Sequence, residues 1–79
     1  MKKVSAIIVN WNGKDFLLDC IKSLCKQEYL DLEIIVSDNG STDGSVEAVR
    51  DWHPNVQLLE NKTNLGFGPA VNRGLAGAV

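Results

Sequence analysis

Three polar clusters in this sequence could bind a ligand, because each follows directly on an apolar run. They are Asn10-Trp11-Asn12, Asp38-Asn39-Gly40-Ser41 and residues 61–68. Asp38 could accept a hydrogen bond from the N3–H of a uracil or thymine ring, and Trp11 offers a flat face on which a base could stack. Each also has a structural alternative: an Asx turn that caps a helix for Asp38, and an apolar plug beneath its loop for Trp11.

Gly66 and Gly68 give the third cluster a different chemistry. They stand where a helix is expected to open, and the free N–H groups and dipole of a helix N-terminus favour a diphosphate. Two glycines at this spacing are a weak signal alone, and any strand end needs a turn former. The convergence of all three clusters is therefore the argument for a site.

The elements that must position these clusters are short strands alternating with helices. Apolar, often β-branched runs predict strands at residues 4–9, 32–37 and 56–59. Strand–helix alternation with short connections predicts an α/β domain with a Rossmann-like parallel sheet and right-handed crossovers. In such a sheet, ligands bind beyond the carboxyl ends of the strands, which is where the three clusters fall.

Helical periodicity fills the gaps between the strands. The first helix is expected over residues 14–27, and the second ends at Pro54. The apolar face of the second helix consists of Val46, Val49 and Trp52. Three side chains could cap it, and the sequence does not choose among Ser41, Thr42 and Asp43. A third helix begins near residues 66–69 and runs through Leu75.

Length and composition restrict the class of protein. The 79 residues suffice for one domain. A net charge of −2, with scattered basic residues, gives no case for nucleic acid as a partner. No run approaches the roughly 18 apolar residues of a membrane span, and residues 1–9 do not make a signal peptide. We therefore expect a cytoplasmic chain, and any membrane association would come from regions outside it. Cys20 and Cys25 are expected as free, buried or half-buried thiols.

The order of the polar clusters resembles family 2 glycosyltransferases, and most closely their rhamnosyltransferase-like branch. The resemblance is carried by residues 7–12 (IIVNWN), 33–45 (EIIVSDNGSTDGS) and 64–74 (NLGFGPAVNRG). It extends over essentially all 79 residues, and the middle segment is the most specific. It implies that residues 1–79 are the incomplete, N-terminal, nucleotide-sugar-binding part of a GT-A domain, with strand order 3-2-1.

The resemblance also implies roles for five residues. Val9 would offer backbone contacts to the base of a UDP- or dTDP-sugar, and Trp11 would be the aromatic residue beside that base. Asp38 matches the first acid of the family's Asp-Asp/Asn-Gly-Ser motif, which binds the pyrimidine. Asn39 is a permitted variant of the second acid, and Gly66 would approach the diphosphate.

No catalytic residue is expected in this chain. In the family, the Asp-x-Asp metal motif lies on the next strand, and the base and acceptor pocket lie further on, beyond Val79. We therefore expect Mg²⁺ or Mn²⁺ for the full-length enzyme and no metal bound here, since Asp38, Asp43 and Glu60 lack the spacing of a shared ligand set. The whole protein would transfer a hexosyl or rhamnosyl group, with inversion, to a glycan or lipid-linked acceptor in cell-wall or polysaccharide biosynthesis. These residues alone would be inactive.

Two other interpretations stay open. A non-catalytic α/β binding or self-assembly module would be favoured by a stop codon after Val79, whereas a reading frame that continues into a strand ending in Asp-x-Asp would favour the enzyme. A dinucleotide-binding or receiver domain is disfavoured, because no Gly-x-Gly-x-x-Gly follows the first strand and no acidic pair ends it. Since the first strand would lie at the sheet edge, we also expect a homodimer through residues 4–9, or aggregation.

Overall fold

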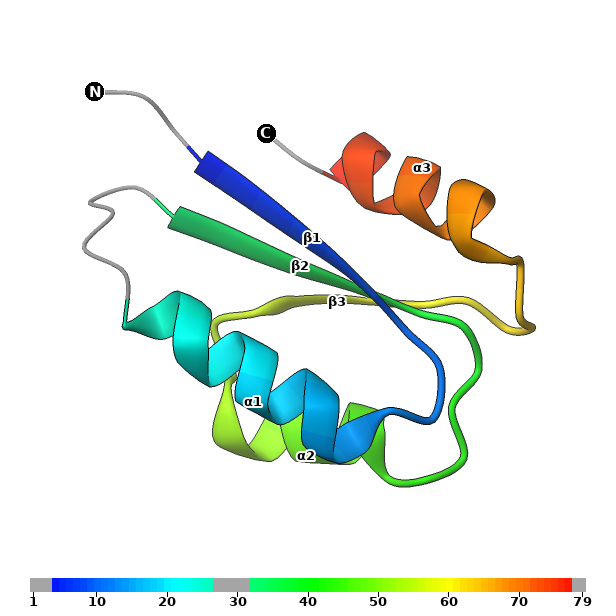
Figure 1. Ribbon diagram of the computed structural model, residues 1–79. Helices are drawn as coiled ribbons and strands as arrows, with labels where there is room; N and C mark the ends of the chain where they lie inside the picture. Colours follow the sequence, from blue (N-terminus) through cyan, green and yellow to red (C-terminus); the bar gives the residue numbers. More distant parts are fainter. Residues whose placement is uncertain (1–3, 27–31, 78–79) are drawn as a thin grey trace.

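A three-stranded parallel sheet separates two helices on one face from a third helix on the other (Figure 1). This computed structural model describes residues 4–26 and 32–77. The elements are, in chain order, β1 (Val4–Asn10), α1 (Lys14–Cys25), β2 (Leu32–Asp38), α2 (Ser45–Trp52), β3 (Gln57–Glu60) and α3 (Phe67–Gly77). The strand order β1-β2-β3 places β2 in the middle. It confirms the predicted α/β class and the order 3-2-1.

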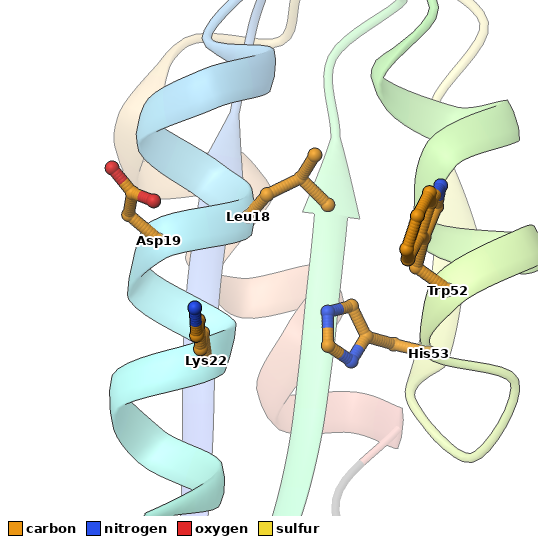
Figure 2. A pocket seen from close by; sticks show the side chains of 5 residues that line it. All are labelled: Leu18, Asp19, Lys22, Trp52 and His53. Atoms are coloured by element: carbon orange, nitrogen blue, oxygen red, sulfur yellow. The ribbon is translucent and has the colours of Figure 1, made fainter.

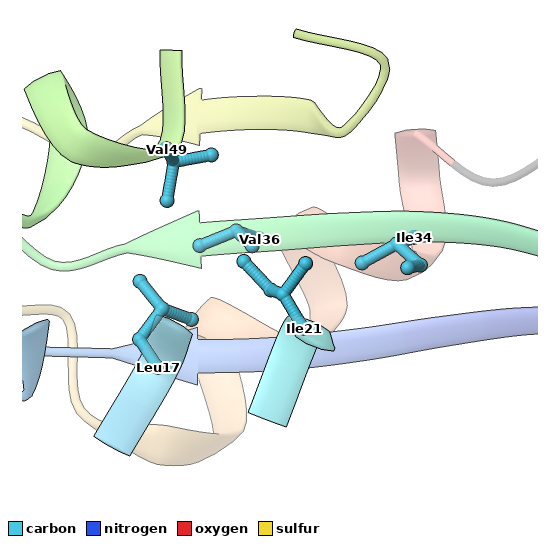
Figure 3. Close-up of a cluster of buried hydrophobic side chains, with 5 residues drawn as sticks. All are labelled: Leu17, Ile21, Ile34, Val36 and Val49. Carbon is cyan, nitrogen blue, oxygen red and sulfur yellow. The ribbon is translucent and has the colours of Figure 1, made fainter. Parts of the chain in front are cut away.

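β2 is the centre of the core because helices cover both of its faces. On the face toward α1 and α2, a cluster of buried apolar side chains (Figure 3) consists of Leu17, Ile21, Ile34, Val36 and Val49. Ile35 is also fully buried, and it points to the opposite face because successive strand side chains alternate. A nearly continuous apolar run is what a strand covered on both faces requires.

α3 packs closely on the sheet through small residues. Ala70 is fully buried and Gly74 is buried. A Cβ atom added at Gly74 would lie 2.4 Å from Cγ2 of Ile7 on β1, a distance that real contacts do not reach. Glycine at this position therefore sets how near α3 approaches β1.

The start of α2 differs from the sequence prediction. The helix begins at Ser45 behind Gly44, whose φ of 86° places it in the left-handed region that suits glycine. The N-cap residue itself has no side chain to cap the helix, so none of the three candidates, Ser41, Thr42 and Asp43, occupies the N-cap position. Asp43, the residue before this N-cap, accepts a hydrogen bond from the backbone N–H of Ser45 at 3.0 Å.

Several other local expectations need correction. Trp52 is 76% exposed and does not belong to the apolar face of α2, because the face is completed by Val46, Ala48 and Val49. The strand boundaries differ from the predicted ones by one residue, and α3 continues to Gly77, beyond the predicted end at Leu75. α1 ends at Cys25, and the predicted end at residue 27 lies outside the described part. Both cysteines are free as predicted, although Cys25 is exposed. No helix in the described part is long and apolar enough to cross a membrane.

Candidate functional site

The loops that leave the three strands gather on one side of the sheet, at the right of the view in Figure 1. We call residues 10–12, 38–41 and 61–66 the strand-end rim. Its three parts are joined by hydrogen bonds between residues more than 20 positions apart in sequence. The predicted convergence of the polar clusters is therefore present in the structure.

The first and second loops are linked through two asparagines of the β1 end. Asn10 donates from Nδ2 to Asp38 Oδ1 at 2.8 Å and to Ser41 Oγ at 3.2 Å. The backbone N–H of Asn12 also donates to Ser41 Oγ, at 2.9 Å. In return, Asn12 Oδ1 accepts the N–H of Thr42 at 2.7 Å. These bonds fix the loop that carries Trp11 against the loop that follows β2.

Asp38 is 2% exposed, and its carboxylate receives three hydrogen bonds from within the chain. Asn10 and the Ser41 hydroxyl donate to Oδ1, the latter at 2.7 Å, and the Ser41 N–H donates to Oδ2 at 2.9 Å. The contact with the Ser41 N–H is the Asx-type alternative considered from the sequence. A carboxylate offers about four acceptor positions, so one position on Oδ2 remains.

The third loop is linked to the second through Asn39, which is 3% exposed. Its Nδ2 donates to Asn64 Oδ1 and to the Gly66 carbonyl oxygen, each at 3.2 Å. Its Oδ1 accepts from Asn61 Nδ2 at 3.0 Å. Asn39 is thus built into the rim and does not project from it.

Two of the predicted site residues lie on or just after β1. Val9 is half-buried and is aligned with Ser37 of β2; the side of β1 away from β2 has no strand beside it in the described sheet. Trp11 is 58% exposed, so it is not the buried plug that was its structural alternative. Its ring is accessible to a flat ligand.

Gly66 lies at the entrance to α3 and has a φ of 82°, a left-handed conformation. Its N–H donates to Asn64 Oδ1 at 2.8 Å, and its carbonyl oxygen accepts the N–H of Ala70 at 3.4 Å. A Cβ atom here would meet nothing within 4 Å. The space around the N-terminus of α3 is therefore open on the rim side.

Asp43 is an ionisable group whose pKa is clearly displaced. The hydrogen bond from the Ser45 hydroxyl is the main cause, and the backbone N–H groups of Lys14 and Ser45 add to it. Together they outweigh desolvation and hold the pKa of Asp43 below its ordinary value. Asp43 thus ties the start of α1 to the start of α2.

A hollow lies between α1 and α2, away from the strand-end rim (Figure 2). It has a volume of about 360 Å³ and is lined by Leu18, Asp19, Lys22, Trp52 and His53. Leu18 and Trp52 come from different helices and make its floor largely apolar. The sequence patterns did not predict this hollow, because Trp52 was assigned to the core.

The described residues do not fit a divalent metal. Within residues 4–26 and 32–77, no group of three His, Cys, Asp or Glu side chains lies close enough to hold one. The carboxylate of the strand-end rim, Asp38, is already bound by the chain's own donors. A metal that neutralises a diphosphate would need ligands from elsewhere.

Sequence reasoning missed four residues that hold the rim together: Asn10, Ser41, Asn61 and Asn64. All four belong to the polar clusters, but none was expected to join the loops, and Ser41 was considered only as a helix cap. A usable signal was present, since each is a short polar residue that follows a strand or begins a turn, where its side chain can bond to a neighbouring loop.

Comparison with known protein families and relatives gives a consistent result. The family model of Glycosyl transferase family 2 matches residues 5–79. An uncharacterized glycosyltransferase of Escherichia coli strain K12, YibD, is 41% identical over 76 residues, which are 92% of this chain and 22% of that protein. The N-acetylglucosaminyl-diphospho-decaprenol L-rhamnosyltransferase of Mycobacterium tuberculosis is 49% identical over 45 residues, or 57% of this chain and 15% of that protein.

A solved structure is also similar. The mannosyltransferase PcManGT from Pyrobaculum calidifontis, in complex with GDP-Man and Mn²⁺, superimposes with a TM-score of 0.88 and 31% identity. The match covers 98% of this chain and 24% of that chain. The likeness confirms the predicted GT-A fold for the part that this chain covers. The chain spans less than a quarter of the length of these proteins.

Proposed function

Because this chain belongs to glycosyl transferase family 2, we propose that its strand-end rim binds the nucleotide part of a nucleotide-diphospho-sugar. The observation that carries the proposal is the joining of three loops into one rim, with an exposed tryptophan and an open helix N-terminus on it. The PcManGT structure holds GDP-Man, which supports a nucleotide-sugar as the ligand class.

The proposed site uses the residues expected from the sequence. Trp11 stacks on the base, Val9 offers backbone contacts beside it, and Gly66 leads the diphosphate to the first N–H groups of α3. The remaining acceptor position on Asp38 Oδ2 takes the N3–H of a pyrimidine. Since Asp38 is 2% exposed, a pyrimidine reaches this position only when a local shift of the rim uncovers Oδ2. Asn39, which was also expected in the site, is 3% exposed and supports the rim from within the chain.

The whole protein is proposed to be an inverting hexosyl- or rhamnosyltransferase. The oxygen of an acceptor hydroxyl attacks the anomeric carbon of the donor, the bond from that carbon to the diphosphate oxygen breaks, and a base takes the hydroxyl proton. The base, the acceptor pocket and the ligands for Mg²⁺ or Mn²⁺ lie outside these 79 residues in this proposal. These residues alone then bind donor without transferring sugar. The acceptor is a glycan or lipid-linked saccharide, a class supported by the name of the mycobacterial relative.

Replacement of Trp11 by alanine tests the proposal with the least risk of unfolding the chain. Asp38 is a poorer choice, because its removal would break three internal hydrogen bonds. Trp52 provides a matched control, since it is also largely exposed but lies on α2, away from the rim. Calorimetric titration would measure the binding of UDP, dTDP and GDP to each variant.

We expect Trp11→Ala to weaken nucleotide binding by about 5- to 150-fold, the effect of losing roughly 1–3 kcal/mol of base stacking. Trp52→Ala should bind as the unmodified chain does. Absence of nucleotide binding by the unmodified chain, or an equal loss in both variants, would refute the proposed site.

A further inference from the structure

Asn39 uses both hydrogens of its side-chain amide within the chain. They go to Asn64 Oδ1 and to the carbonyl oxygen of Gly66, and the Oδ1 of Asn39 accepts from Asn61. At 3% exposure, this side chain has neither a free donor nor an open surface for a ligand. Its contribution to the rim must therefore be indirect.

Two backbone groups fix the direction of these hydrogen bonds. The Gly66 carbonyl can only accept, so the end of Asn39 that faces it must be the nitrogen. The Gly66 N–H can only donate, so the end of Asn64 that faces it must be the oxygen. The oxygen end of Asn39 then needs a donor, which Asn61 supplies. The amide orientations thus follow from the backbone.

The same direction accounts for an unpaired buried atom. Asn61 is 4% exposed and donates from Nδ2 to Ser37 Oγ and to Asn39 Oδ1, each at 3.0 Å. Its own Oδ1 has no hydrogen-bond partner in the described structure. Turning the amide over would set the oxygens of Asn61 and Asn39 against each other. The unpaired Oδ1 of Asn61 is therefore the consequence of the direction in which Asn61 donates to Asn39 and Asn39 donates to Asn64 and Gly66.

We infer that Asn39 is a positioning residue that holds the 61–66 loop, and with it the N-terminus of α3, in place for a diphosphate that Asn39 itself does not touch. The Gly66 carbonyl that accepts from Asn39 also accepts the N–H of Ala70, so the bond acts directly on the first turn of α3. This inference rests on the proposed function of the rim.

At position 39, aspartate could not make the hydrogen bonds that asparagine makes, although the family's motif allows both residues. A carboxylate at position 39 would present an oxygen to two acceptors, Asn64 Oδ1 and the Gly66 carbonyl. By contrast, Asn64 receives both of its recorded hydrogen bonds on Oδ1, so a carboxylate at position 64 could keep them. Asn39→Asp and Asn64→Asp therefore make the same chemical change a few ångströms apart with opposite consequences for the loop.

The test compares these two variants in the 79-residue chain, with and without nucleotide. Without nucleotide, amide hydrogen exchange at Gly66 and Ala70 should become about tenfold faster in Asn39→Asp and change little in Asn64→Asp. With UDP as probe, Asn39→Asp should bind about tenfold more weakly than the unmodified chain, whereas the two should bind uridine, which has no diphosphate, equally. In the unmodified chain, the Asn39 side-chain NH₂ should exchange slowly, a result that does not depend on any variant.

Equal exchange at Gly66 in the two variants, or a UDP affinity of Asn39→Asp equal to that of the unmodified chain, would overturn the inference, as would fast exchange of the Asn39 side-chain NH₂. A parallel loss of uridine and UDP binding in Asn39→Asp would also overturn it, because it would indicate a general structural defect. If the unmodified chain binds neither UDP nor GDP, the proposed function fails, and the exchange measurements still decide whether Asn39 holds the loop.

Discussion

At the scale of single residues, the rim is held mainly by short polar side chains that bond to neighbouring loops. Asp38 and Asn39 illustrate the point, because both were expected to face a ligand and both are nearly buried. The position of each at the end of β2 could be predicted from the apolar run before it. Their partners could not, since Asn10 and Asn64 lie 28 and 25 positions away and no local pattern links residues so far apart.

Asp43 gives a pH dependence with a defined sign. Its folded-state pKa lies below its unfolded value, so its contribution to stability is fully present above the unfolded pKa of about 3.9 and is lost as the pH falls through the lower, folded value. We expect the unmodified chain to melt above Asp43→Asn at pH 6 and the gap to narrow at pH 3. Thermal unfolding at both pH values would measure this gap, and a gap of the same size at both would contradict the assignment.

At the scale of helices and strands, the close approach of α3 to β1 depends on Gly74. Gly74→Ala would place a methyl group 2.4 Å from Ile7 Cγ2, and overpacking of this kind costs about 1–3 kcal/mol, more than the gain of up to about 1 kcal/mol in helix propensity. Gly68→Ala is the matched control on the same helix, because nothing lies within 4 Å of its added Cβ.

Urea unfolding of the two variants would compare their stabilities. Gly74→Ala should unfold at lower urea concentration than the unmodified chain, and Gly68→Ala at an equal or higher one. Equal stability of the two variants would show that Ile7 yields and that Gly74 does not set the spacing.

The elements themselves could largely be predicted, because apolar runs and helical periodicity report burial directly. β1 and β2 were each predicted one residue too short at the carboxyl end, where Asn10 and Asp38 are polar but still pair in register. Trp52 was misplaced because periodicity alone does not tell which side of a short helix lacks a neighbour. The N-cap position of α2 was not predicted, because Gly44 occupies it in a left-handed conformation, and Asp43 accepts the N–H of Ser45 from the residue before it.

At the scale of the whole molecule, β1 forms an edge of the described sheet. It carries no charged residue and no proline along Val4–Asn10, the features that usually prevent strand addition. We expect the 79-residue chain to associate through this edge. Ser5 is exposed on β1, so Ser5→Lys should shift the chain toward monomer, whereas Asn55→Lys, with the same added charge in an exposed turn, should not.

Sedimentation velocity over a range of concentrations would measure this association. A monomeric unmodified chain at the highest concentration, with well-dispersed amide resonances, would argue against it. The strand order that places β1 at the edge was implied by the family resemblance, because the lengths and compositions of the connections alone do not determine which strand lies outside.

The account depends on one claim above the others, that the joined strand ends bind nucleotide. An amide NMR titration of the unmodified chain with UDP and GDP tests it most directly. We predict that the largest shifts fall on Trp11, including its indole N–H, and on residues 66–68. Shifts centred instead on Leu18, Trp52 and His53 of the hollow between α1 and α2, or no shifts at all, would contradict the claim.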